Sequence, residues 1–287
     1  MAIGILMSIG EVVFTVLIAA LVKFITDDIS VFVILFFRYL LCIPILLVVA
    51  ISQRGQDLFE IKDKPKLILR SILGLASFGT LFAALQSIEL STMTALLQTI
   101  PIFVTLMAPI LIGERVGWPR RIAVLIGFIA VFLIIDPSSK NWLNFGLVLG
   151  ILSPFFGALM LITLRKLGQT DHPSSTALWY NIIGAISFLL VSIAMNSIWP
   201  SNLELYYMLI AIGIMSSFQQ IFLSYSHKLA PAVVLAPLRY LSVPFGVVAG
   251  MVFFNETLTG SFFIGVGLLV CSSFFIIKRN QSNVSQN

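Results

Sequence analysis

Three ionisable residues stand in the middle of long apolar stretches of this 287-residue chain: Glu11, Arg38 and Arg239. Ionisable groups at such positions are costly to bury, so they usually face a cavity, a partner or water. A guanidinium keeps its charge in a protein, whereas a carboxyl group can take up a proton. The three groups therefore predict a site that binds an anionic group of a small molecule, with Glu11 as the candidate for proton coupling. The alternative is structural: Glu11 pairs with one arginine to fix helix packing, and Arg38 extends along its helix toward water.

Arg239 is the first candidate for the anion contact. Even if Glu11 pairs with one arginine, the other stays available for a carboxylate or phosphate, which the planar guanidinium binds with two parallel hydrogen bonds. Arg239 lies beside Tyr240 and between Pro237 and Pro244, where a bent helix would face a cavity. We therefore expect Arg239 and Arg38 to be substrate-binding residues.

Uncharged polar and aromatic residues in the other apolar stretches extend the candidate site. Ser and Thr commonly bond to their own helix backbone, but amide side chains are harder to explain as packing. Rings beside them would offer flat walls to a ring or a cationic group. The further candidates for substrate binding are Gln98, Asn181, Gln220, Trp179, Tyr240 and Phe14, and the candidate hinges are Pro101, Pro237 and Pro244.

The residues that carry catalysis or hold metals are nearly missing. The histidines, His172 and His227, lie near the ends of apolar stretches, and the cysteines, Cys42 and Cys271, lie inside them without metal-ligand spacing. The chain also lacks a Gly-rich phosphate loop. We expect no enzyme activity, no metal, no cofactor and no nucleotide-driven pump.

The composition predicts that lipid surrounds the chain. Hydrophobic residues make up 59% and charged residues 10%, whereas soluble domains carry about 25% charged residues. The net charge of +5 does not point to nucleic acid, because no basic cluster lies on a soluble module. Charged and Pro/Gly/Ser-rich breaks divide the chain into ten apolar helices. Their ranges are 3–24, 30–52, 67–88, 91–112, 120–136, 145–165, 174–196, 204–226, 231–254 and 259–278.

Charges between these helices predict the orientation. With a cytoplasmic N-terminus, most of the 17 Lys and Arg fall on the inside, Arg70 among them, and only Lys23 and Lys140 lie outside. This asymmetry follows the positive-inside rule. Both termini are therefore predicted to be cytoplasmic.

An internal repeat predicts how the ten helices are arranged. Glu114 and Glu256 open the fifth and tenth predicted helices and are separated by 142 residues, and Pro101 and Pro244 keep this offset within one residue. Five spans per half is an odd number, so the second half must insert upside down. Secondary transporters often have such inverted repeats, with the substrate site between the halves. The predicted units are residues 1–143, residues 144–279 and a disordered cytoplasmic tail, 280–287.

The stretches Phe36-Phe37-Arg38-Tyr39 and Ala236-Pro237-Leu238-Arg239-Tyr240-Leu241, together with the inverted repeat, resemble the drug/metabolite transporter superfamily. The EamA type is the most similar, and residues 231–256 look most like the branch of bacterial S-adenosylmethionine uptake carriers. The resemblance covers almost the whole chain. It implies that helices one to four and six to nine line a central cavity, while five and ten are peripheral. It says little about the substrate, because this architecture also exports amino acids and carries sugars, vitamins and nucleotide derivatives.

The expected function is secondary active transport of a small polar metabolite, anionic or zwitterionic, across a bacterial inner membrane by alternating access. The substrate could be similar to S-adenosylmethionine or to an amino acid, and protons or a counter-metabolite could drive it. A proton-coupled exporter of amino acids or drugs is the alternative within transport. A membrane scaffold or lipid-handling protein is the alternative from another class. Formation of a homodimer stays open.

Overall fold

The computed structural model describes residues 2–112, 117–135, 144–229, 235 and 238–284. Within these ranges every regular element is helical and no strand occurs. Seven helices are long and apolar enough to cross a membrane, and three shorter apolar helices accompany them. The α-helices are α1 (Ala2–Ile25), α2 (Val31–Arg54), α3 (Lys64–Ala84), α4 (Leu90–Leu97), α5 (Ile100–Ile112), α6 (Trp118–Ile135), α7 (Phe145–Leu167), α8 (Pro173–Ala194), α9 (Leu203–Leu229), α11 (Ser242–Phe254) and α12 (Gly260–Val284). Two short 3₁₀ helices are η1 (Gly55–Phe59) and η2 (Arg239–Leu241).

The apolar runs of the sequence became helices for a physical reason. Lipid offers no hydrogen bonds, so a spanning segment must satisfy its backbone internally, as a helix does. The helix bounds lie within a few residues of the predicted ones; α1 covers 2–25 and α7 covers 145–167. Polar side chains fix two starts: Asp63 accepts the N–H of Lys66 at 3.1 Å, and Asn144 accepts the N–H of Leu147 at 2.7 Å.

The fourth predicted helix is interrupted. It was expected to run from 91 to 112, but α4 ends at Leu97 and α5 begins at Ile100. Pro101 explains the break, because it has no N–H to donate to the carbonyl four residues earlier and its ring clashes with that carbonyl. The ninth predicted helix, 231–254, differs in a similar way. Its described part is η2 followed by α11, and Pro244 lies in the first turn of α11.

The C-terminal segment also differs from the prediction. Residues 280–287 were expected to be disordered, yet α12 continues as a helix to Val284.

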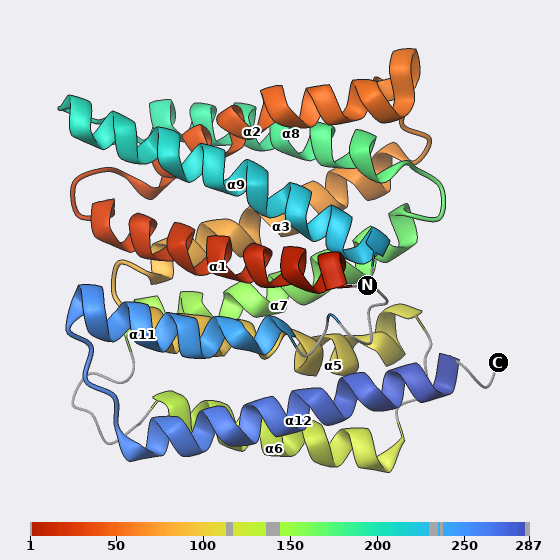
Figure 1. Ribbon diagram of the computed structural model, residues 1–287, viewed down its shortest axis with the longest axis vertical. Helices are drawn as coiled ribbons and strands as arrows, with labels where there is room; N and C mark the ends of the chain where they lie inside the picture. Colours follow the sequence, from red (N-terminus) through yellow and green to blue (C-terminus); the bar gives the residue numbers. More distant parts are fainter. Residues whose placement is uncertain (1, 113–116, 136–143, 230–234, 236–237, 285–287) are drawn as a thin grey trace.

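The long helices run roughly parallel or antiparallel to one another and pack in pairs (Figure 1). The partners are α1 with α9, α2 with α8, α3 with α7, α4 with α11, and α6 with α12. Each pair joins a helix that precedes residue 136 to one that follows residue 143. The chain enters α1 and leaves α12 at the same end of the bundle (Figure 1).

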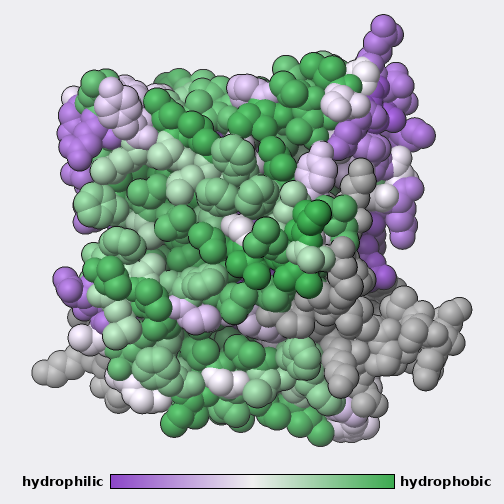
Figure 2. Space-filling model, viewed as in Figure 1, coloured by the Kyte–Doolittle hydropathy of each residue, from purple (hydrophilic) through white to green (hydrophobic). Residues whose placement is uncertain are grey.

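Three clusters of buried apolar residues hold the described helices together, and the two larger ones are described here. The larger lies among α1, α2, α3, α8 and α9 and includes the fully buried Ile34, Leu35 and Leu209. The smaller joins α6 and α12 through Ala130 and Leu269. In the space-filling view, hydrophilic residues gather at the two ends of the helices and hydrophobic ones cover the band between them (Figure 2). Such a band is the surface expected where a bilayer surrounds the bundle.

Candidate functional site

Glu11 and Arg239, far apart in the sequence, meet in the structure. Arg239 Nη2 of η2 lies 3.7 Å from Glu11 Oε1 of α1. The Glu11 side chain is 8% exposed, whereas that of Arg239 is 45% exposed. A separation of 3.7 Å is too long for a hydrogen bond, so this contact is an ion pair held by charge alone. Arg239 makes no recorded hydrogen bond to the described residues, so its N–H groups can donate to another anion.

The other partners of Glu11 are weak. The hydroxyl of Thr15, one turn further along α1, lies 3.4 Å from Glu11 Oε1, while its stronger bond, 2.8 Å, goes to the Glu11 backbone carbonyl. Gln219 of α9 donates to the Thr15 hydroxyl at 2.7 Å. A buried carboxylate normally collects several strong hydrogen bonds or a close cation. Glu11 has neither among the described residues.

Phenylalanine rings form a wall beside Glu11. Phe14, one turn after Glu11, stacks on Phe218 of α9 with ring centroids 6.0 Å apart and lies 5.6 Å from the ring of Phe222. A Cβ at Gly10 would come within 2.7 Å of the Phe222 ring, so only glycine lets α1 and α9 approach here. Phe14 thus lies one turn from Glu11 on α1, and α9 adds two rings that the sequence did not single out.

Gln98 and Tyr240 occupy the region where two broken helices meet. Gln98 Nε2 donates to Ser242 Oγ at 2.7 Å, and Ser273 Oγ of α12 donates to the Gln98 carbonyl at 3.1 Å. Gln98 follows the end of α4, and Ser242 begins α11. Tyr240 follows Arg239 in η2 and is buried. Gln98 therefore ties the two interruptions together.

Asn181 and Gln220 form a second polar contact, between α8 and α9. Their amide groups approach to 3.5 Å, and Gln220 Nε2 lies 3.6 Å from Cys42 Sγ of α2. Trp179 has another recorded hydrogen bond: its indole N–H donates to the Phe59 carbonyl of η1 at 3.0 Å. Trp179 thus lies on the side of α8 that faces η1, and no contact with Glu11 or Arg239 brings it into their site.

The candidate hinges lie where helices restart. Pro101 is the second residue of α5 and Pro244 the third of α11, so each follows a change in helix direction or type. Pro237 lies outside the described residues, as does Glu114.

Two arginines are buried without an acidic partner. Arg38 of α2 is 2% exposed and Arg70 of α3 is 8% exposed. Counting Arg70 among the loop cations was wrong, because α3 begins at Lys64 and covers it. The sequence held the signal, since the predicted span 67–88 already included position 70. The bundle therefore encloses four ionisable groups rather than three among its described residues.

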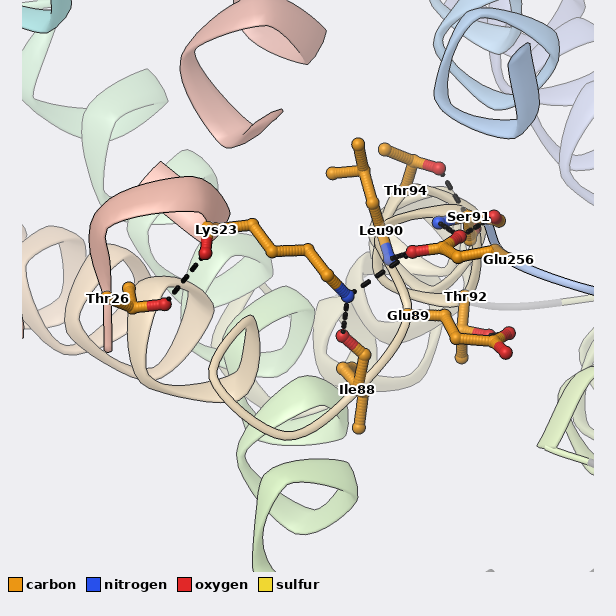
Figure 3. A network of polar contacts seen from close by, with 9 residues as sticks. All are labelled: Lys23, Thr26, Ile88, Glu89, Leu90, Ser91, Thr92, Thr94 and Glu256. Carbon is orange, nitrogen blue, oxygen red and sulfur yellow. Dashed lines mark hydrogen bonds and ion pairs between the residues drawn. The ribbon is translucent and has the colours of Figure 1, made fainter. Parts of the chain in front are cut away.

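A network of polar contacts connects the end of α1, the start of α4 and Glu256 (Figure 3). Glu256, just after α11, accepts the N–H of Leu90 at 2.6 Å and that of Ser91 at 3.0 Å, as well as the Ser91 hydroxyl. Lys23 at the end of α1 lies 3.2 Å from Glu256 Oε1 and donates to the Ile88 carbonyl at 2.6 Å. The carboxylate thus caps the N-terminus of α4, where free N–H groups and the helix dipole favour an anion. We name Lys23, Glu256 and these backbone groups the Glu256 latch.

The backbone conformation at Asn255 directs the Glu256 side chain toward α4. Asn255 adopts a left-handed conformation (φ 51°), and the N–H of Glu256 donates to the Gly250 carbonyl at 3.1 Å. This is the turn that commonly ends a helix. Nearby, burial raises the pKa of Glu89, and the Glu256 carboxylate raises it further, against the opposing effects of Lys23 and Thr92. Glu89 therefore binds a proton at higher pH than an ordinary glutamate does.

A second carboxylate joins the chain at the other end of the helices. Asp171, between α7 and α8, accepts the N–H of Lys62 at 2.6 Å and that of Asp63 at 3.2 Å, and the Thr170 hydroxyl at 2.6 Å. Burial raises the pKa of Asp171, but these hydrogen bonds outweigh it and hold the pKa below its usual value. Asp171 therefore fastens the segment before α3 to the turn before α8.

The described residues contain no group of three or more His, Cys, Asp or Glu that could hold a metal ion. The chemistry that the site offers is recognition of charge: a carboxylate with unfilled acceptor positions and an arginine with free donors.

Comparison with known proteins connects this arrangement to transporters. The chain is 30% identical to a protein of Helicobacter pylori named as an uncharacterized transporter, over 74% of this chain and 72% of that protein. It is 25% identical to the pseudopaline exporter CntI of Pseudomonas aeruginosa, over 91% of each chain. It is 24% identical to an S-adenosylmethionine uptake transporter of Rickettsia prowazekii, over 92% of this chain and 88% of that protein.

A solved crystal structure shares the fold, with a TM-score of 0.63, 15% sequence identity and 94% of each chain covered. The EamA-like transporter family matches the sequence twice, over residues 2–136 and again over residues 144–278. The resemblance to the drug/metabolite transporter superfamily is thereby confirmed. With almost the whole sequence matched and the apolar helices in place, this multi-pass membrane protein belongs to the EamA-like transporter family.

Proposed function

We propose that the chain is a secondary transporter that moves a small zwitterionic or anionic metabolite across the bacterial inner membrane by alternating access, without enzyme activity or a cofactor. The observation that carries this proposal is the loose ion pair between Glu11 and Arg239. It joins the first helix to the element before α11. A substrate that supplied one anionic and one cationic group could replace each member of the pair as the partner of the other.

A zwitterion satisfies both ends of this pair. Its carboxylate would accept hydrogen bonds from the free donors of Arg239, and its ammonium or sulfonium group would lie against Glu11 and the ring of Phe14. The S-adenosylmethionine uptake relative supports a substrate with an amino-acid head group. Without substrate, a proton on Glu11 could discharge the same carboxylate, which is how protons would be coupled to transport.

The helix pairs support the inverted five-plus-five repeat. In such a repeat, α1 corresponds to α7 as the first span of its half, and α3 corresponds to α9 as the third. The pair of α1 with α9 therefore corresponds to the pair of α7 with α3, and both pairs occur. The pairs α2 with α8, α4 with α11 and α6 with α12 each map onto themselves. The family match to two segments, 2–136 and 144–278, supports the same division at about residue 143.

Alternating access would use the interruptions and the latch. We expect α5 and α11 to tilt at the breaks before Pro101 and Pro244, while release of the Glu256 latch opens one end. In the orientation that the charges predict, with both termini cytoplasmic, this is the periplasmic end, and Asp171 lies at the cytoplasmic end. Export of a zwitterion is the second candidate, favoured by the similarity to the pseudopaline exporter.

Uptake into proteoliposomes tests the proposal. The panel holds labelled amino acids, each beside a methyl ester that lacks the carboxylate and an N-acyl derivative that lacks the ammonium group, and S-adenosylmethionine beside its methyl ester. We expect a zwitterion to accumulate or exchange, and its derivatives to fail. Opposite pH gradients distinguish import from export. Movement of no panel member in either direction would contradict the proposal and favour a scaffold or lipid-handling role.

A further inference from the structure

Arg38 and Arg70 lack the partners that buried cations normally have. Neither forms an ion pair with a carboxylate of the described residues, and the Nε and Nη1 atoms of both make no hydrogen bond within that part of the chain. Both residues are more than nine-tenths buried. A guanidinium remains protonated in a protein, so two full positive charges stand here without an anion.

Aromatic rings offset only part of the free energy that is lost when these two cations are removed from water. Arg38 Cζ lies 3.9 Å from the centroid of the Phe78 ring and 5.0 Å from that of Tyr39, and Arg70 Cζ lies 3.7 Å from that of Tyr180. A cation over a ring is stabilised by less free energy than it loses when it is removed from water, even after relaxation. The rings hold the guanidinium groups in place and leave their N–H edges free.

The two arginines stand at different depths of the bundle. With a helix rise of about 1.5 Å per residue, Arg38 lies about 10 Å from the start of α2, and Arg70 lies about 9 Å from the start of α3. These helices follow one another through η1, so they begin at opposite ends of the bundle. Arg38 therefore lies toward the end that holds the Glu256 latch, and Arg70 toward the end that holds Asp171.

A pair of tyrosines separates the two arginines. The hydroxyls of Tyr39 and Tyr180 are 2.7 Å apart and hydrogen-bonded, with the rings nearly perpendicular. Each ring occupies space left by a glycine: a Cβ at Gly184 would lie 2.8 Å from the Tyr39 ring, and a Cβ at Gly74 would lie 2.9 Å from the Tyr180 hydroxyl. The tyrosines belong to α2 and α8, which pack directly against each other.

We infer that Arg38 and Arg70 are two positions of an oxyanion-binding site, one on each side of the Tyr39–Tyr180 pair. The ligand is a small molecule or ion with a carboxylate or phosphate group, which accepts the parallel N–H groups of a guanidinium. This site is distinct from the zwitterion site at Glu11 and Arg239, and its binding does not depend on the proposed transport. The tyrosine hydroxyls are the next hydrogen-bond partners for an oxyanion that leaves either arginine.

Thermal unfolding of the purified full chain in a neutral detergent tests the inference, with inorganic phosphate as the probe and chloride at equal ionic strength as the reference. Phosphate should raise the Tm of the wild type above the chloride value, in a saturable way that yields an apparent Kd. Arg38→Met and Arg70→Met should each weaken this Kd at least about thirtyfold, the lower range for loss of a buried charged partner. Arg121→Met is the matched control, because Arg121 also lies over a ring, 5.2 Å from that of Trp118, but is exposed.

Phosphate stabilises many proteins weakly by exclusion from their surface. The measured quantity is therefore the difference in the phosphate-induced Tm increase between Arg121→Met and the two buried-arginine variants. Equal phosphate effects in all four proteins would overturn the inference. If the Met variants do not fold, Arg38→Lys and Arg70→Lys replace them; these keep the charge and should still lose most of the affinity. Failure of the Lys variants to fold as well would assign the arginines to packing and overturn the inference too. The assay reads phosphate binding at Arg38 and Arg70 and not transport, so its outcome can be interpreted even if the transport proposal fails.

Discussion

Glu11 and Arg239 form the contact on which most of the proposed chemistry depends. Each has a partner, but 3.7 Å is a distance at which charge attracts without hydrogen bonding. A tightly bonded pair would be too stable to exchange partners during transport. The long separation and the half-exposed arginine instead describe a pair that a substrate or a proton can separate.

The first prediction concerns proton coupling. Glu11→Gln keeps the size of the side chain but removes its charge and its proton uptake. We expect pH-driven accumulation of the substrate to be abolished, while exchange of substrate across proteoliposomes without a pH gradient stays measurable. Glu60→Gln is the control, because Glu60 pairs with Arg54 at the surface. Full proton coupling in Glu11→Gln would assign Glu11 to helix packing.

The second prediction concerns the anion contact of Arg239. Arg239→Ala should weaken substrate binding by about 2–5 kcal/mol, the usual cost when one partner is removed from a hydrogen-bonded charge pair that is buried in the complex, here by the bound substrate. Arg239→Lys should not restore affinity, because lysine lacks the planar fork. A substrate methyl ester should bind wild type and Arg239→Ala almost equally, which closes a double-mutant cycle. If Arg239→Ala lowers the Tm but retains wild-type affinity in calorimetry, the arginine is structural.

Among the elements, α4 and α11 are joined by a charge at a helix end in addition to their buried apolar contacts. The Glu256 latch collects the orphan N–H groups of α4 and the ammonium of Lys23 in one contact. Such a contact breaks as a unit, because loss of the carboxylate leaves several donors and one cation unsatisfied. It suits an element that alternates between joined and separated states.

The third prediction follows from this latch. Glu256→Gln should favour the state in which α4 and α11 separate, since the amide cannot pair with Lys23. A cysteine introduced at the buried Thr94, which lies against Gly246 of α11, should then react several times faster with a membrane-impermeant thiol reagent. Glu60→Gln should leave the rate unchanged. Equal rates in all three proteins would show that the latch does not limit opening.

The fourth prediction concerns the contact of Asp171 with the segment before α3. Asp171→Asn should lower the free energy of unfolding by about 1–3 kcal/mol, the cost of leaving buried donors poorly satisfied. Because the folded state lowers the pKa of Asp171, the stabilisation is complete above its unfolded pKa, near 4, and is lost as pH falls through the folded pKa.

Chemical or thermal unfolding between pH 7 and pH 3 measures the difference in free energy of unfolding between wild type and Asp171→Asn. The control is Asp57→Asn, because Asp57 of η1 is exposed. The gap between wild type and Asp171→Asn should be constant near neutral pH and shrink in acid. A gap that is independent of pH would mean that Asp171 contributes through size and shape instead of charge.

At the scale of the whole molecule, the proposed inverted repeat predicts which loops share a side of the membrane. Single cysteines at Lys62 and Gln169 should label from one side and a cysteine at Asn202 from the other, in a background that lacks Cys42 and Cys271. All three positions are exposed and lie between described helices. Labelling of 62 and 202 from the same side would contradict the five-plus-five arrangement, as would same-side labelling of 62 and 140.

The sequence by itself determined the apolar, helical character and the approximate bounds of most described helices, because a bilayer admits only segments whose backbone is satisfied internally and whose side chains are apolar. It also identified Glu11, Arg38 and Arg239, since an ionisable group in an apolar run needs a special environment. Prolines 101 and 244 predicted bends for a local reason, the lost hydrogen bond. All of these conclusions depend on neighbours along the chain.

Only the tertiary structure decided which groups meet. It paired Glu11 with Arg239 across 228 positions of sequence, joined Glu256 to the start of α4, and put Tyr39 against Tyr180. It also separated Trp179 from the charged pair and buried Arg70, which is adjacent to a basic segment and looked like a loop residue. The physical reason is that ion pairs, hydrogen bonds and ring contacts act over a few ångströms. Helix packing brings distant residues within that range, and periodicity and hydropathy along one chain do not record which helices pack together.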